Sequence, residues 1–128
     1  MSKAFERKKL AIKFVRADLE EIFLSRVLKG PVHGYSFIAE VKDRYGVFFG
    51  PSTIYPLINS LEENGYVSSQ WRTDTERPRK EYHHIPIKTR ERLELIVQEK
   101  EQAVRKTKEM SKESLSVQTL RTPTLMEA

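Results

Sequence analysis

The sequence contains no cysteine, which excludes disulfide bridges, thiolate zinc ligands and a cysteine nucleophile. It has no stretch of about 18 apolar residues, so we expect no membrane span. Residues 1–16 alternate charged and apolar side chains and lack the apolar segment of a secretory signal peptide. These absences make a cytoplasmic location the expectation.

Catalytic and metal-binding patterns are also missing. The sequence has no nucleophile beside a base, no pair of carboxylates that suggests a pocket and no Gly-rich phosphate loop, so we expect neither an enzyme nor a cofactor. His83-His84 is the one pair that invites a metal interpretation. Adjacent strand residues point to opposite faces, and no third ligand is spaced nearby, so we expect no metal site.

Positive charge is what the sequence has in excess. Of its 128 residues, 23 are Lys or Arg and 18 are Asp or Glu, which gives a formal net charge of +5. A basic balance favours polyanionic partners such as DNA, RNA or an anionic membrane face. The length allows one ordinary domain.

The first part of the chain shows helical periodicity. Apolar residues at i, i+3, i+4 and i+8 predict a helix over residues 17–29, and Gly30-Pro31 ends it. Residues 33–45 form a second predicted helix. The basic segment 1–16 is either a frayed arm or the extension of a helix, and it either contacts DNA or forms a solvated surface.

The third predicted helix, residues 52–64, has the clearest pattern. Ser52 or Thr53 is expected to cap its N-terminus, which places Pro56 in the first turn, where a missing N–H costs little. The residues that repeat at i, i+3, i+4 and i+7 and should face the core are Ile54, Leu57, Ile58 and Leu61.

The second part of the chain begins with a strand pattern. Residues 66–72 and 80–85 are predicted strands, joined by the polar loop 73–79 into a β-hairpin. Pro86 is expected to start a long charged helix that ends near residue 112. Ser and Thr dominate the residues from 113 on, which predicts a disordered tail.

This order of elements predicts a winged helix-turn-helix fold, mainly α with a small β-hairpin. Helices 33–45 and 52–64 would form the helix-turn-helix pair, with the second in the major groove, which admits one α-helix. Asn59 is the best candidate for reading bases, because Asn can pair bidentately with adenine. The candidate contact residues on the exposed face of this recognition helix are Ser52, Thr53, Tyr55, Asn59 and Ser60.

The hairpin would be the wing, and its basic side chains could follow phosphates or enter a minor groove. Contacts with phosphates would make the affinity fall as salt rises. Trp71 lies in the same hairpin, where a core or interface anchor is favoured over a residue that stacks on a ligand. The candidate wing residues for DNA contact are Arg72, Arg77, Arg79 and Lys80.

A regulator of this size needs two copies to read enough sequence, and two-fold dimers reach half-sites about one turn of DNA apart. The last helix is expected to make the homodimer through the apolar stripe Leu93, Ile96, Val97 and Val104. The expected organisation is a basic arm or helix extension at 1–16, a DNA-binding domain at 17–86, a dimerisation helix at 87–112 and a disordered tail at 113–128.

Four motifs in a fixed order resemble the PadR family of winged helix-turn-helix transcriptional regulators. The resemblance covers about residues 19 to 97. The motifs are Gly30-Pro31-Val32-His33-Gly34-Tyr35, Pro51-Ser52-Thr53-Ile54-Tyr55-Pro56-Leu57-Ile58, Leu61-Glu62-Glu63-Asn64-Gly65-Tyr66-Val67 and Arg77-Pro78-Arg79-Lys80-Glu81-Tyr82.

The resemblance implies a C-terminal dimerisation helix, repression of nearby genes and, in many relatives, a small-molecule effector whose identity the sequence does not give. The sequence also differs from the family pattern at two places. The family often has Gly-Thr where this chain has Ser52-Thr53, and it usually has a Thr and a Gly where this chain has Pro86 and Thr89. We therefore expect a repressor that binds double-stranded DNA as a homodimer. The alternative is a winged helix that binds another protein and does not read DNA.

Overall fold

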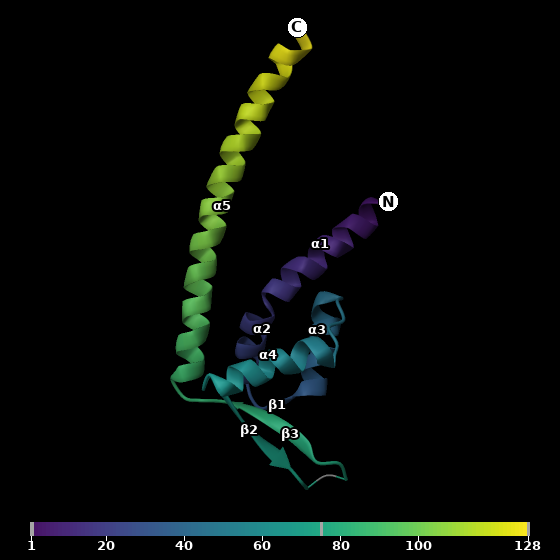
Figure 1. Cartoon of the computed structure of the whole chain (residues 1–128), viewed down its shortest axis with the longest axis vertical. Coiled ribbons are helices and arrows are strands. Elements are labelled where there is room, and N and C mark those ends of the chain that lie inside the picture. The colour runs from purple at the N-terminus through teal and green to yellow at the C-terminus, as the bar shows by residue number, and fades with distance from the viewer. Residues whose placement is uncertain (1, 75, 128) are drawn as a thin grey trace. The chain divides into compact units, whose positions relative to one another are not determined.

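The structure is a computed structural model that describes residues 2–74 and 76–127, with side-chain surroundings described up to residue 117 (Figure 1). The helices and strands follow one another in the order that the sequence predicts, with one short strand added. In chain order they are α1 (Lys3–Ala17), α2 (Leu19–Leu28), β1 (Val32–His33), α3 (Gly34–Tyr45), α4 (Pro51–Glu63), β2 (Val67–Arg72), β3 (Arg79–His84) and α5 (Lys88–Glu127).

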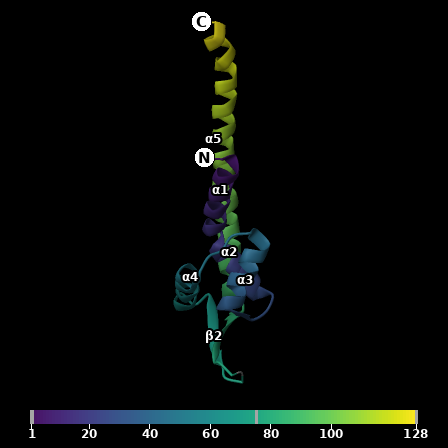
Figure 2. The ribbon, with the colours of Figure 1, turned by 90° about the vertical axis from the view of Figure 1, so that its right-hand side faces the viewer.

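Contacts divide the chain into two units, Met1–Glu94 and Leu95–Ala128, which are described separately below. In the first unit, hairpin β2–β3 extends from the helices on the side opposite to α1, as both views show (Figures 1 and 2). In the second unit, the described chain is the remainder of α5. No described helix has the length and apolar character to cross a membrane.

The core of the first unit lies between α2, α3, α4 and one face of the sheet. Phe23 of α2 is fully buried and meets the ring edges of Phe37, at 4.9 Å between centroids, and Tyr82, at 6.0 Å. Ile54 and Ile58 of α4 are equally inaccessible. The core face predicted for α4 is confirmed, with Leu61 also buried and Leu57 half-buried.

The sheet is antiparallel and has the order β1-β3-β2. Strand β1 consists of two residues, Val32 and His33, which pair with Tyr82 and Glu81. The sequence prediction missed it, because two residues are too short for an alternating pattern to be visible. This strand places the beginning of α3 directly beside the hairpin.

Helix α4 begins one residue earlier than the sequence predicts. Gly50 is the N-cap, and its carbonyl accepts from the amides of Thr53 and Ile54, both at 3.0 Å. The prediction that Ser52 or Thr53 caps the helix is therefore wrong. Pro51 occupies the first helical position, where its fixed φ suits the helix and its missing N–H costs nothing. Pro56 consequently lies beyond the first turn, inside the helix.

Within the basic segment 1–16, residues 3–16 lie in helix α1 and do not form a frayed arm. Ser2 caps α1 by accepting from the amide of Phe5, and the helix ends at Asp18. None of its residues is buried, and Phe14 is 63% exposed. Arg16 stacks over the Phe49 ring at 5.6 Å, which is one contact between this helix and the connection before α4.

Helix α5 differs from the prediction at both ends. It begins at Lys88, not Pro86, because the intervening Ile87 has a left-handed φ of 71°. Its helical backbone continues to Glu127, where the sequence predicts a disordered tail from 113. Ser and Thr lower helix propensity by only tenths of a kcal/mol each, so their abundance does not by itself end a helix.

The first turn of α5 is anchored through Thr89, a fully buried polar side chain. Its hydroxyl donates to the Tyr66 carbonyl at 2.6 Å and accepts from the Ile85 amide at 2.8 Å. Arg92, one turn later, pairs with Glu20 at 3.0 Å and stacks on the Tyr66 ring. These contacts join the beginning of α5 to α2 and to the residue before β2.

Candidate nucleic-acid interface

The outer face of α4 carries the residues that the sequence assigns to base reading. Ser52, Asn59 and Ser60 are exposed, whereas Thr53 and Tyr55 are half-buried. The opposite face of the helix holds the core residues, so the two faces are cleanly divided. The Asn64 side chain donates to the Ser60 carbonyl at 2.7 Å and also lies 3.5 Å from the Ser60 hydroxyl.

Tyr55 joins the two helices of the helix-turn-helix pair. Its ring meets Tyr35 of α3 edge-on, with centroids 6.3 Å apart, and burial raises the pKa of its hydroxyl. A Cβ at Gly34, the first residue of α3, would overlap the Tyr55 ring and hydroxyl. A larger residue at Gly34 would therefore displace the Tyr55 ring from its place against α3.

Glu62 links the end of α4 to the hairpin, a role that the sequence analysis did not assign. Its carboxylate accepts a short hydrogen bond from the Ser69 hydroxyl of β2 and pairs with Lys80 of β3 at 3.3 Å. The link holds the wing against the recognition helix. Nothing in the local sequence identifies it, because the three residues come from three separate elements.

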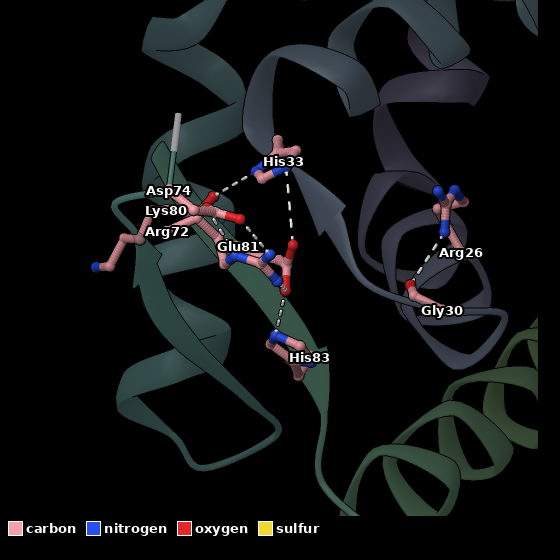
Figure 3. A network of polar contacts seen from close by, with 8 residues as sticks. All are labelled: Arg26, Gly30, His33, Arg72, Asp74, Lys80, Glu81 and His83. Atoms are coloured by element: carbon pink, nitrogen blue, oxygen red, sulfur yellow. Dashed lines mark hydrogen bonds and ion pairs between the residues drawn. The ribbon is translucent and has the colours of Figure 1, made fainter. Parts of the chain in front are cut away.

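A second network lies on the other face of the hairpin, around the Glu81 carboxylate (Figure 3). Arg72 approaches Glu81 at 3.5 Å and Asp74 at 2.8 Å, and this guanidinium lowers the pKa of the Asp74 carboxyl. His83 lies 2.8 Å and His33 3.9 Å from the same carboxylate. The network ties β1 to the hairpin.

The predicted wing cations therefore have different surroundings. Arg72 and Lys80 are both paired with carboxylates of the protein itself. Arg77 and Arg79 are exposed toward the tip of the hairpin. In the part of the chain that the structure describes, no group of three or more His, Cys, Asp or Glu residues is arranged to hold a metal ion.

The predicted dimerisation stripe of α5 is only partly covered. Leu93, Ile96 and Val97 are half-buried, and Val104 is 43% exposed. Further along α5, Met110 is 70% exposed. The second unit thus presents apolar side chains that the described chain does not cover.

The fold and this surface define a winged helix-turn-helix protein. Helices α3 and α4 form the pair, the polar face of α4 is exposed, and the hairpin β2–β3 that follows is the wing. The family model described as the transcriptional regulator PadR-like family matches residues 23–95, and the chain belongs to this family. It is a family of transcriptional regulators and not of enzymes.

Solved structures agree with the fold. A PadR family transcriptional regulator from Eggerthella lenta is 22% identical, with a TM-score of 0.71, over 85% of this chain and 96% of that one. A transcriptional regulator from Clostridium thermocellum is 21% identical, with a TM-score of 0.67, over 76% and 93%. Bacillus subtilis PadR, solved in complex with operator DNA, is 21% identical, with a TM-score of 0.55, over 62% and 45%. Comparison with curated proteins gives no match.

Proposed function

We propose that this protein is a cytoplasmic repressor that binds an inverted-repeat operator in double-stranded DNA as a homodimer. The observation that carries the proposal is the exposed polar face of α4, with Ser52, Asn59 and Ser60 outward, beside a hairpin that Glu62 holds in place. The operator complex of Bacillus subtilis PadR supports the assignment by likeness of fold.

Within this proposal α4 enters the major groove and Asn59 reads a base edge. Ser52 and Thr53, in the first turn of the helix, are suited to a phosphate, because their hydroxyls can donate to it and the helix dipole favours an anion there. Tyr55 is half-buried with its hydroxyl against Gly34, so in this proposal it supports the position of this face on α3. Ser60 is the last polar contact along the helix.

The wing cations differ by position in this proposal. Arg77 and Arg79, exposed toward the tip of the hairpin, contact phosphates. The pairs of Arg72 and Lys80 with carboxylates hold the wing in shape, and both cations add a weaker electrostatic attraction. We expect the dimer to form through the stripe of α5, which would set the two recognition helices at half-sites about one turn of DNA apart.

Selection of binding sites from random duplex DNA, read by sequencing at two salt concentrations, tests the proposal. Recovery of an inverted repeat whose affinity falls with salt is the expected result, because phosphate contacts release counterions. Enrichment of no sequence, together with no binding to any duplex at low salt, would contradict the proposal. It would favour the alternative of a winged helix that binds another protein.

A further inference from the structure

Trp71, the one tryptophan of the chain, is 63% exposed near the end of β2. The sequence favours a core or interface anchor over a residue that stacks on a ligand, and the structure does not bury Trp71 in the core. It is also the one large apolar side chain that is exposed among the described residues of hairpin β2–β3. An exposed indole gains free energy when a partner covers it, and this one lies near the outer end of the wing.

The register of the hairpin shows which way Trp71 points. Side chains alternate along a strand, so Trp71 shares a face with Ser69 and Val67 of β2. Across the hairpin, Ser69 pairs with Tyr82 and Trp71 pairs with Lys80. This is the face on which Ser69 and Lys80 reach Glu62 at the end of α4. The Trp71 side chain therefore points to the same side of the hairpin as Ser69, the side that faces α4, and lies two residues closer to the tip.

The charge of the wing alone gives it little attraction for DNA. Four cations in β2–β3 and its loop, Arg72, Arg77, Arg79 and Lys80, stand against three anions, Asp74, Glu76 and Glu81. Arg72 and Lys80 are paired with carboxylates of the protein. A wing that is nearly balanced in charge needs contacts of another kind to add affinity.

A duplex backbone offers such a contact, because each apolar deoxyribose lies next to a phosphate oxygen. Indole combines a large apolar ring with a single N–H donor. We infer that Trp71 is a DNA-contacting residue of the wing, with its ring on a deoxyribose and its Nε1–H donating to a phosphate oxygen of the duplex that α4 binds. This inference rests on the proposed function.

The emission of the only tryptophan reports on this contact without a label. The wild-type protein is titrated with the duplex recovered by selection, while emission and accessibility to a neutral collisional quencher are recorded. Binding is followed separately by the anisotropy of the same duplex carrying a dye. The expected result is a change in emission and reduced quenching that saturate together with the anisotropy.

Variants test whether the contact contributes affinity. Trp71→Ala should weaken binding roughly tenfold, the loss that truncation of one interface tryptophan commonly gives. The salt dependence should keep its slope, because no phosphate is neutralised by an indole. Trp71→Phe, which keeps a ring and loses the N–H, should lose less. Gln70→Ala, on the opposite face of the same strand, is the matched control and should bind as the wild type does.

Three results would overturn the inference. Wild-type anisotropy that saturates with no change in emission or quenching, together with unaltered binding by Trp71→Ala, would remove Trp71 from the interface and leave the proposed function intact. Emission that already changes with protein concentration before DNA is added would assign Trp71 to an interface between copies of the chain. Failure of the wild-type protein to bind any duplex would overturn both the inference and the proposed function.

Discussion

Every buried side chain among the described residues lies between Leu19 and Thr89, whereas α1 buries none and the described part of α5 buries none after Thr89. The first region has an interior of its own, with Phe23, Phe37 and Tyr82 packed edge to face. The two flanking helices instead expose apolar side chains such as Phe14 and Met110. The difference teaches that the middle region is stabilised within one chain, while the flanking helices present apolar side chains that a second copy would cover in the proposed homodimer.

The largest expected effect is the loss of the central ring of the core. Phe23→Ala should lower the free energy of unfolding by about 3–5 kcal/mol, because it removes a fully buried ring and leaves a cavity. Phe14→Ala removes the same ring from an exposed position on α1 and should cost under about 0.5 kcal/mol at protein concentrations where the chain is monomeric. Urea unfolding measures both, and equal losses would break the comparison.

A charged residue introduced into the apolar stripe of α5 should weaken self-association without changing the fold of the single chain. Ile96→Glu is expected to weaken self-association by roughly a hundredfold or more, because an unpaired carboxylate would be buried in the interface. Its helix content should stay that of the wild type. Gln98→Glu introduces the same side chain at an exposed position of the same helix and is the control. Analytical ultracentrifugation gives both dissociation constants, and unchanged association of Ile96→Glu would rule out this stripe as the dimer contact.

The Thr89 hydroxyl joins the first turn of α5 to the residue before β2 and the residue after β3. Thr89→Val keeps the shape of the side chain but leaves the Tyr66 carbonyl and the Ile85 amide without their partner, and should cost about 1–3 kcal/mol. Thr89→Ser restores the hydroxyl and should recover most of the loss. Thermal unfolding of the three proteins checks the order, and a valine variant as stable as the wild type would show that water replaces both bonds.

The smallest expected effect is on the pH dependence of folding stability in alkaline solution. Burial raises the pKa of the Tyr82 hydroxyl above its usual value of about 10, so the folded state holds this proton more tightly than the unfolded state does. The stability that this contributes is complete below pH 10 and is lost as the pH rises through the folded pKa. Tyr82→Phe should therefore show a shallower decline in stability across this window, measured by urea unfolding. An identical decline in both proteins would contradict the assignment.

Periodicity predicted the elements that bury a regular face. The i, i+3, i+4 pattern of α4 is confirmed by burial of Ile54, Ile58 and Leu61, because the core that selects these positions is the same core that the helix meets. Strand β1 and the Gly50 cap were missed. A strand of two residues is too short to show an alternating pattern. A glycine N-cap has no side chain to accept a hydrogen bond from the helix, so the usual search for a capping side chain does not find it.

The candidate site was less predictable than the fold. The sequence indicates that Ser52, Asn59 and Ser60 of α4 face outward, because that follows from the core face alone. It does not indicate that Tyr55, predicted on the same exposed face, packs against α3. It does not indicate that Lys80 pairs with Glu62, or Arg72 with Asp74 and Glu81. Such pairings depend on the register of the hairpin and on how α4 packs beside it, and neither is encoded in local spacing.

The most direct test of the account compares two substitutions on the selected operator and on a scrambled duplex of the same composition. Asn59→Ala should lose affinity for the operator and little for the scrambled duplex, so that discrimination falls, whereas Arg79→Ala should weaken binding to both alike and lower the salt slope by about one. Anisotropy titrations at several salt concentrations give the four affinities. If Asn59→Ala discriminates as the wild type does, or if Arg79→Ala binds both duplexes as the wild type does, then α4 and the wing do not have the roles proposed for them.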